Sequence, residues 1–269
     1  MRALGALAVA ASLVITAACS GSDDEAPDAG PAPDALAEAV ASLTDANVGR
    51  LTFQVGDDND ALIRTTGAYV LDARQTEWQM TLSNGERSVV TEQRRLGDRA
   101  WLRSARNGEA PTSCWQAFGA RRASERTSTQ FEPPADASPD HPLLPHVAVA
   151  TTAEGEKWVS PGSVVEGTAD LYSVAATLGE VVGELDLNPA TLTGRAAVSF
   201  LLDDGEVLAW NTDVVAVLES LAEAGVELTD DMQELVETGA EIRMATGFSD
   251  LAGDVEVEAP GPRDICKDK

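Results

Sequence analysis

Short segments in which apolar and polar residues alternate recur along this 269-residue chain, and turns separate most of them. In the clearest one, Leu51, Phe53 and Val55 alternate with Thr52 and Gln54. A period of two is typical of a strand with one buried face, and short connections join antiparallel strands because a parallel crossover needs about a dozen residues or more. Further segments that read as strands lie at 61–72, 75–82, 87–96, 98–103, 114–118, 157–165, 192–202, 206–211, 240–248 and 254–259. The chain is therefore predicted to form a large antiparallel sheet.

Helical segments are fewer and shorter. Residues 34–43 place Leu36, Ala37, Val40 and Leu43 on one face, which predicts an amphipathic helix. Other helices are expected at 142–150, 168–179, 213–224 and 230–238, the last with Thr229 as its N-cap. This order of elements indicates an α+β protein with one large curved sheet.

The first 18 residues are predicted to be a signal peptide. A basic Met1-Arg2 precedes the apolar residues 3–15, a run within the roughly 7 to 15 residues of a signal core. Small residues at 16–18 then lead directly to Cys19, which resembles the lipobox of bacterial lipoproteins. In that family a diacylglycerol, with acyl chains such as palmitate, is attached to the cysteine, which becomes the new N-terminus. The alternative is an ordinary secretory leader cut after Ala18, because Thr16 stands where the family usually has Leu.

Residues 19–35 are predicted to be the lipidated cysteine and a disordered acidic spacer. Positions 20–35 carry three prolines and five acids but no large apolar residue, so they cannot offset the entropy of folding. Residues 36–269 would then form a single domain. The expected location is the cell envelope, on the outer face of the cytoplasmic membrane, held there by the lipid anchor.

The composition excludes some partners. The net charge of −26 argues against nucleic acid, because phosphate backbones are bound by clustered Lys and Arg. No apolar stretch after the leader approaches the roughly 18 to 20 residues that a membrane-spanning helix needs. Two further cysteines, Cys114 and Cys266, lie in the exported part, where a pair favours a disulfide; the alternative is two free thiols.

Several segments together resemble the LppX/LprG group of actinobacterial lipoproteins and, more remotely, LolA-like carriers. The matching segments, in order, are the lipobox with its spacer, ALAEAVASL leading into RLTFQV, Gly67-Ala68-Tyr69, RLGDRAWLRS, VEGTADL, DDGEV and ATGFSDLAGDVEVEAPGP. The resemblance implies a half-open barrel whose concave face is covered by short helices. It also implies that a lipid or glycolipid ligand binds between the sheet and these helices.

Two sets of residues are candidates for contact with such a ligand. The candidates for an apolar ligand-binding face are Phe53, Tyr69, Trp78, Met80, Leu82 and Trp101, which could equally pack the covering helices. The candidates for contact with anionic headgroups are Arg94, Arg95, Arg99 and Arg103, in a segment with eight Arg against three acids. The alternative for these arginines is a solvated face of a hairpin.

No motif for an enzyme, a cofactor or a metal is found. The sequence lacks a Gly-x-Ser-x-Gly elbow, a phosphate loop, His-Glu-x-x-His and CxxC. Residues 56–60 are acidic but lack the spacing of a calcium loop, so a hairpin turn is expected there. Two functions remain open: an envelope lipoprotein that binds or carries a lipid, and a non-enzymatic cell-surface interaction or sensor protein with a packed core and no ligand cavity.

Overall fold

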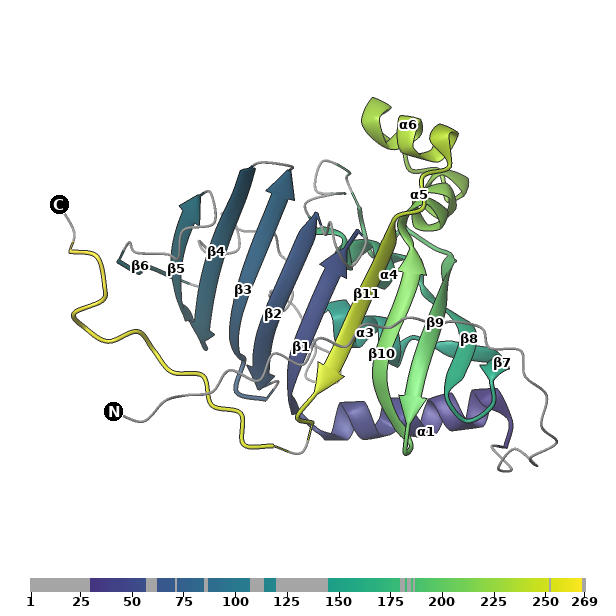
Figure 1. The fold of residues 1–269 in the computed structure, drawn as a ribbon, viewed down its shortest axis with the longest axis horizontal. Helices are drawn as coiled ribbons and strands as arrows, with labels where there is room; N and C mark the ends of the chain where they lie inside the picture. The colour runs from purple at the N-terminus through teal and green to yellow at the C-terminus, as the bar shows by residue number, and fades with distance from the viewer. Residues whose placement is uncertain are drawn as a thin grey trace.

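Almost all of the predicted strands pair into one antiparallel sheet, shown in Figure 1. The computed structural model describes residues 30–56, 62–70, 72–84, 87–106, 114–119, 145–179, 182, 185, 187–251 and 253–267. Within them, eleven strands lie in the order β6-β5-β4-β3-β2-β1-β11-β10-β9-β8-β7. The strands are β1 (Val48–Val55), β2 (Ile63–Val70), β3 (Gln75–Asn84), β4 (Arg87–Leu96), β5 (Arg99–Arg106), β6 (Gln116–Gly119), β7 (Glu154–Ser160), β8 (Val164–Asp170), β9 (Arg195–Asp203), β10 (Glu206–Asp213) and β11 (Arg243–Ser249).

The sheet consists of two meanders joined by the first and last strands. Strands β1–β6 follow one another in space, and so do β7–β11, because short turns connect most neighbours. The two series meet where β1 pairs with β11, with Phe53 opposite Thr246. The sheet is open, since β6 and β7 form its two edges.

Five helices are seen in the described part: α1 (Ala32–Asp45), α3 (Pro145–Thr151), α4 (Leu171–Thr177), α5 (Val214–Glu223) and α6 (Asp230–Thr238). Helix α1 confirms the first predicted helix but begins at Ala32, inside the expected spacer, because prolines fit the first turn of a helix. Its buried residues are Ala32, Leu36, Ala39 and Leu43. Ala37, which was expected on this face, is exposed.

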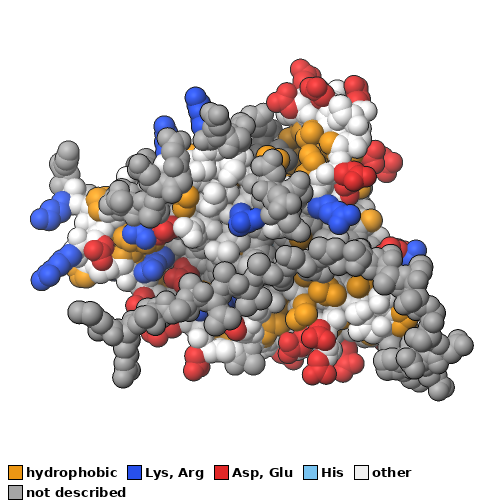
Figure 2. Space-filling model, in the orientation of Figure 1, with side chains coloured by type: hydrophobic (Ala, Val, Ile, Leu, Met, Phe, Trp, Pro, Cys, Tyr) orange, Lys and Arg blue, Asp and Glu red, His pale blue; other side chains and the backbone are white. Residues whose placement is uncertain are grey.

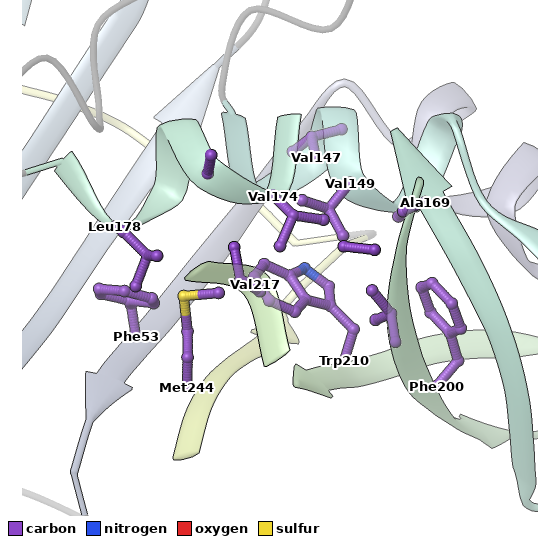
Figure 3. Packing of buried hydrophobic residues seen from close by; sticks show 14 of the residues in the cluster. Phe53, Val147, Val149, Ala169, Val174, Leu178, Phe200, Trp210, Val217 and Met244 are labelled. Carbon is purple, nitrogen blue, oxygen red and sulfur yellow. The ribbon is translucent and has the colours of Figure 1, made fainter. Parts of the chain in front are cut away.

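The core lies between the helices and one face of the sheet, here called the inner face. Trp210 and Phe200 from β10 and β9, together with Phe53 from β1, are buried on this face (Figure 3). Helix α3 packs directly on it: the Trp210 indole Nε1 donates to the carbonyl of His146 at 3.0 Å. Truncating a buried Trp or Phe of this kind costs about 3 to 5 kcal/mol, so this side of the sheet is the stable part of the fold.

Two local sequence signals, a hairpin turn and a helix cap, lie at the expected positions. The Asp204 and Gly205 backbones have φ of 47° and 78°, the left-handed pair that a tight hairpin turn between β9 and β10 requires. The Thr229 hydroxyl caps α6 by accepting from the Met232 N–H. The hairpin and the cap are both confirmed.

Three expectations need correction. Residues 157–165 are not one strand but the turn and flanks of the β7–β8 hairpin, because Pro161-Gly162 reverses the chain. The strand β8 continues to Asp170, so the following helix begins at Leu171 rather than 168. Residues 254–259 form no strand, since β1 and β10 already occupy both sides of β11.

Candidate functional site

Five of the six predicted apolar-face residues lie together on the inner face of β1–β3. Phe53, Tyr69, Trp78 and Met80 are almost completely buried, and Leu82 is partly buried against them. The strand register explains the grouping: side chains opposite one another in paired strands share a face, and Gly67 stands opposite Trp78. The small glycine leaves room for the close approach of the β3 backbone at Glu77 and Trp78.

Trp101 lies on the opposite, outer face of the sheet. Strand β5 has consecutive large apolar residues, Trp101 and Leu102, and only one of them can point inward. Leu102 is the inward one, because it stands opposite the inner-face residue Gln93. The prediction for Trp101 was therefore wrong, since alternation alone gives no choice between two adjacent apolar residues.

The inner face of β2 and β3 also buries hydroxyl groups that have no partner. The side-chain oxygens of Thr65, Tyr69 and Thr76 make no hydrogen bond within the part of the chain that the structure describes. These three residues are 0%, 2% and 6% exposed, and burial raises the pKa of Tyr69 above its usual value. Buried polar groups in proteins are nearly always hydrogen-bonded, so an unpartnered set marks a place where a partner group is missing. Sequence reasoning missed Thr65 and Thr76, although both stand at inward positions of alternating strands.

Strand β4 brings polar residues onto the inner face. Gln93 and Arg95 on β4 are 1% and 8% exposed. The Arg95 Nε donates to the Gly97 carbonyl at 3.0 Å. Arg95 therefore points into the protein, rather than toward a headgroup in solvent.

The four predicted headgroup arginines do not form one patch. Arg95 lies on the inner face, Arg99 is exposed at the start of β5, and only Arg94 and Arg103 lie together, on the outer face. Their guanidinium carbons lie 5.2 and 4.4 Å from the centroid of the Trp115 ring. Such cation–π contacts are typical of Arg beside Trp and stabilise by about 0.5 to 1 kcal/mol at partly exposed sites.

Groups within the protein already pair both outer-face arginines. Arg103 forms an ion pair with Glu92 across the β4–β5 hairpin. Arg94 lies 3.6 Å from Glu77 and donates to the Glu258 carbonyl at 3.1 Å. Their role in the structure is thus to hold the C-terminal segment against the sheet.

The predicted disulfide is present and fastens the same segment. Cys114 and Cys266 are bonded, and Trp115 forms a parallel bridge to Ile265. The Trp115 N–H donates to the Asp264 carbonyl, and the Cys266 N–H donates to the Trp115 carbonyl, both at 2.8 Å. A hollow of about 500 Å³ lies beside the disulfide on the outer face, and its lining includes Arg94, Arg103, Cys114, Trp115, Arg263 and Asp264.

A second and larger hollow lies at the connection between α5 and α6. Its volume is about 790 Å³, and the apolar residues that line it are Leu185, Leu187, Leu192, Val226 and Leu228. Sequence reasoning placed the two helices but not this hollow, because its walls come from segments about 40 residues apart in the chain.

Two further observations complete the description of the site. No protein-family model matches the chain, and a comparison with curated proteins finds no match either. In the described part of the chain, no helix combines the length and the apolar character needed to cross a membrane. Cys19 lies outside the described residues.

Proposed function

We propose that this protein is a membrane-anchored envelope lipoprotein that binds or carries a lipid or another apolar ligand on the inner face of β1–β4. The observation that carries the proposal is the set of buried, unpartnered hydroxyls of Thr65, Tyr69 and Thr76 beside Trp78 and Met80. An acyl chain would take the place of the protein groups that now cover the aromatic residues, which are only 1% to 3% exposed, and would keep them out of water. Its ester or carboxyl oxygens would supply the hydrogen-bond partners that the hydroxyls lack.

The proposal includes the anchor and the family resemblance. Cys19 would carry the lipid, and the protein would stand on the outer face of the cytoplasmic membrane. Curvature of the open sheet toward a half-open barrel, as in LppX/LprG-type and LolA-like proteins, belongs to the same proposal. It is supported by the helices that gather over the β7–β10 part of the sheet.

Intact mass spectrometry tests the anchor. The mature protein from an actinobacterial host should begin at Cys19 and carry the added mass of a diacylglycerol. The Cys19→Ser variant should lose that mass and leave the membrane fraction. A wild-type mature chain that begins at Cys19 without added lipid would refute this part.

Native mass spectrometry of the exported Cys19→Ser chain tests the ligand site. A retained lipid is expected, and Thr65→Val or Tyr69→Phe should lower its retention by about five-fold, the value of one hydrogen bond. The same substitutions should not lower the free energy of unfolding of the empty protein and should raise it slightly, because each removes a buried hydroxyl that has no partner among the described residues.

Thr212→Val is the matched control for these variants. The Thr212 hydroxyl is also buried but donates to the Ala197 carbonyl at 2.6 Å. Its removal should reduce stability by about 1 kcal/mol and leave lipid retention unchanged. A wild-type protein that has neither retained lipid nor uptake of a fluorescent fatty acid would overturn the ligand proposal.

A further inference from the structure

The hollow at the α5–α6 connection combines an apolar floor with an acidic rim. Its floor is formed by Leu192 and Leu228, which are buried, and by Leu187 and Val226, which are partly buried. Glu227 and Asp230 stand at its edge and are exposed. Figure 2 shows hydrophobic side chains in the region of these helices, between groups of Asp and Glu.

The acidic charge around this hollow is not balanced. Residues 214–242 contain eight acids and no Lys or Arg. All eight side chains belong to exposed residues, and none of them forms an ion pair within the described part of the structure. The eight acids are Glu219, Glu223, Glu227, Asp230, Asp231, Glu234, Glu237 and Glu241. Two acids on the sheet, in contrast, have basic partners: Glu92 pairs with Arg103, and Glu166 lies 2.8 Å from Lys157.

Helix α6 adds little to the core of the protein. Met232 is its one buried residue, and the helix stands at the opposite end of the strands from α1 (Figure 1). Its N-cap and its left-handed Gly239 define both ends, and Met232, Leu235 and Val236 join it to the core. A well-specified helix whose other residues are mostly exposed is suited to contact with another molecule.

We propose that this hollow is the docking site for a basic amphipathic segment of a partner protein. Its lining consists of residues 224–230 together with Leu185, Leu187, Asn188, Thr191 and Leu192. The apolar side of such a segment fits the leucine and valine floor, and its Lys or Arg side chains meet the unpaired carboxylates. An anionic membrane or lipid headgroup does not fit, because the same carboxylates repel it. The proposal stands whether or not the inner face binds a lipid.

Fluorescence anisotropy with a labelled helical peptide of about 18 residues tests the proposal, because shorter peptides are poorly helical in water. The probe contains only Leu and Lys at amphipathic spacing, and the protein is the exported full chain with Cys19→Ser, so that no detergent is needed. Saturable binding is expected. Two comparison peptides should bind at least about ten-fold more weakly: one with Glu in place of Lys, and one with Ser in place of Leu.

Charge-matched variants separate docking from general attraction to an acidic protein. Glu223→Gln, Glu227→Gln and Asp230→Asn together should weaken binding by about ten-fold. Asp203→Asn, Asp204→Asn and Glu206→Gln remove the same charge at the exposed β9–β10 turn and should change binding by less than about two-fold. Leu187→Ser should also weaken binding, because it removes apolar surface from the floor of the hollow while every carboxylate at its rim stays in place.

Three results would overturn the proposal. The first is equal weakening by both charge triples, and the second is equal binding of the Leu and Ser peptides. The third is sedimentation of the Cys19→Ser protein with phosphatidylglycerol vesicles in the absence of peptide, abolished by Leu187→Ser, which would assign the hollow to a lipid surface instead.

Discussion

The imidazole Nδ1 of His146 lies 2.9 Å from the hydroxyl oxygen of Thr246, and this hydrogen bond joins helix α3 to β11 inside the core. The His146 ring also lies 4.7 Å from the Phe53 ring and 6.1 Å from Trp210, measured between centroids. Burial lowers the pKa of His146 to about 3, because the charged imidazolium would lose its hydration there.

This burial makes stability depend on pH. Between the unfolded pKa of about 6.5 and the folded value near 3, the unfolded chain binds more protons at this site. Stability contributed by neutral His146 is therefore present above pH 6.5 and is lost as the pH falls toward 3. From pH 7 to pH 5 the expected loss is about 2 kcal/mol. Urea unfolding at pH 7 and pH 5 should show this loss of stability in the wild type but not in His146→Gln. The same change in the free energy of unfolding for both proteins would contradict the prediction.

The disulfide should stabilise the fold by closing a very long loop. Its cysteines are 152 residues apart, and the chain-entropy model gives about 5 kcal/mol for a loop of that size. The Cys114→Ser/Cys266→Ser variant should be less stable by up to that amount in urea unfolding without reductant. Hydrogen exchange should also become faster at the Trp115 and Cys266 amides, whose bonds hold the C-terminal segment. A change of less than about 1 kcal/mol would show that the loop is already restrained in the unfolded chain.

Asp170 should be an important cap. Its carboxylate accepts from the Ser173 N–H and from the Ser173 hydroxyl, both at 2.9 Å, at the start of α4. Asp170→Ala should cost about 1 to 2 kcal/mol in thermal or urea unfolding, whereas Asp170→Asn keeps an acceptor and should cost less than half of that. Equal losses of stability in the Ala and Asn variants would mean that Asp170 stabilises α4 through its charge rather than as a hydrogen-bond acceptor.

Gly67 should not tolerate a side chain. A Cβ at this position would lie 2.6 Å from the Glu77 carbonyl oxygen on β3. Gly67→Ala should therefore destabilise the protein by about 1 to 3 kcal/mol, as overpacking usually does. Gly119→Ala on the edge strand β6 meets nothing within 4 Å and is the control, with an expected change of less than about 0.5 kcal/mol.

Much of the fold could be predicted because its signals are local. Strand β4 has the predicted bounds 87–96, and the Asp204-Gly205 turn and the Thr229 cap depend on residues a few positions apart. The pairing of β1 with β11 was not predicted, since nothing near Phe53 specifies a partner at Thr246.

The candidate site was predicted in part. Phe53, Tyr69, Trp78 and Met80 share a face because alternation has a fixed period, but alternation does not say which of two adjacent apolar residues, Trp101 and Leu102, points inward. The alternation of Val255 and Val257 with glutamates suggested a strand. In the structure Val257 is buried, while the Glu258 carbonyl binds Arg94 rather than a neighbouring strand.

The junction of β1 with β11 also sets the order in which the sheet is completed. Strands β1–β6 can pair with one another as soon as residues 48–119 are available, but the second edge of β1 must wait for residues 243–249. A chain that emerges from its N-terminus therefore presents an unpaired β1 edge until nearly all of it has been made or translocated. Contacts this distant in sequence are slow to form, so the closing of this central seam is expected to limit the folding rate.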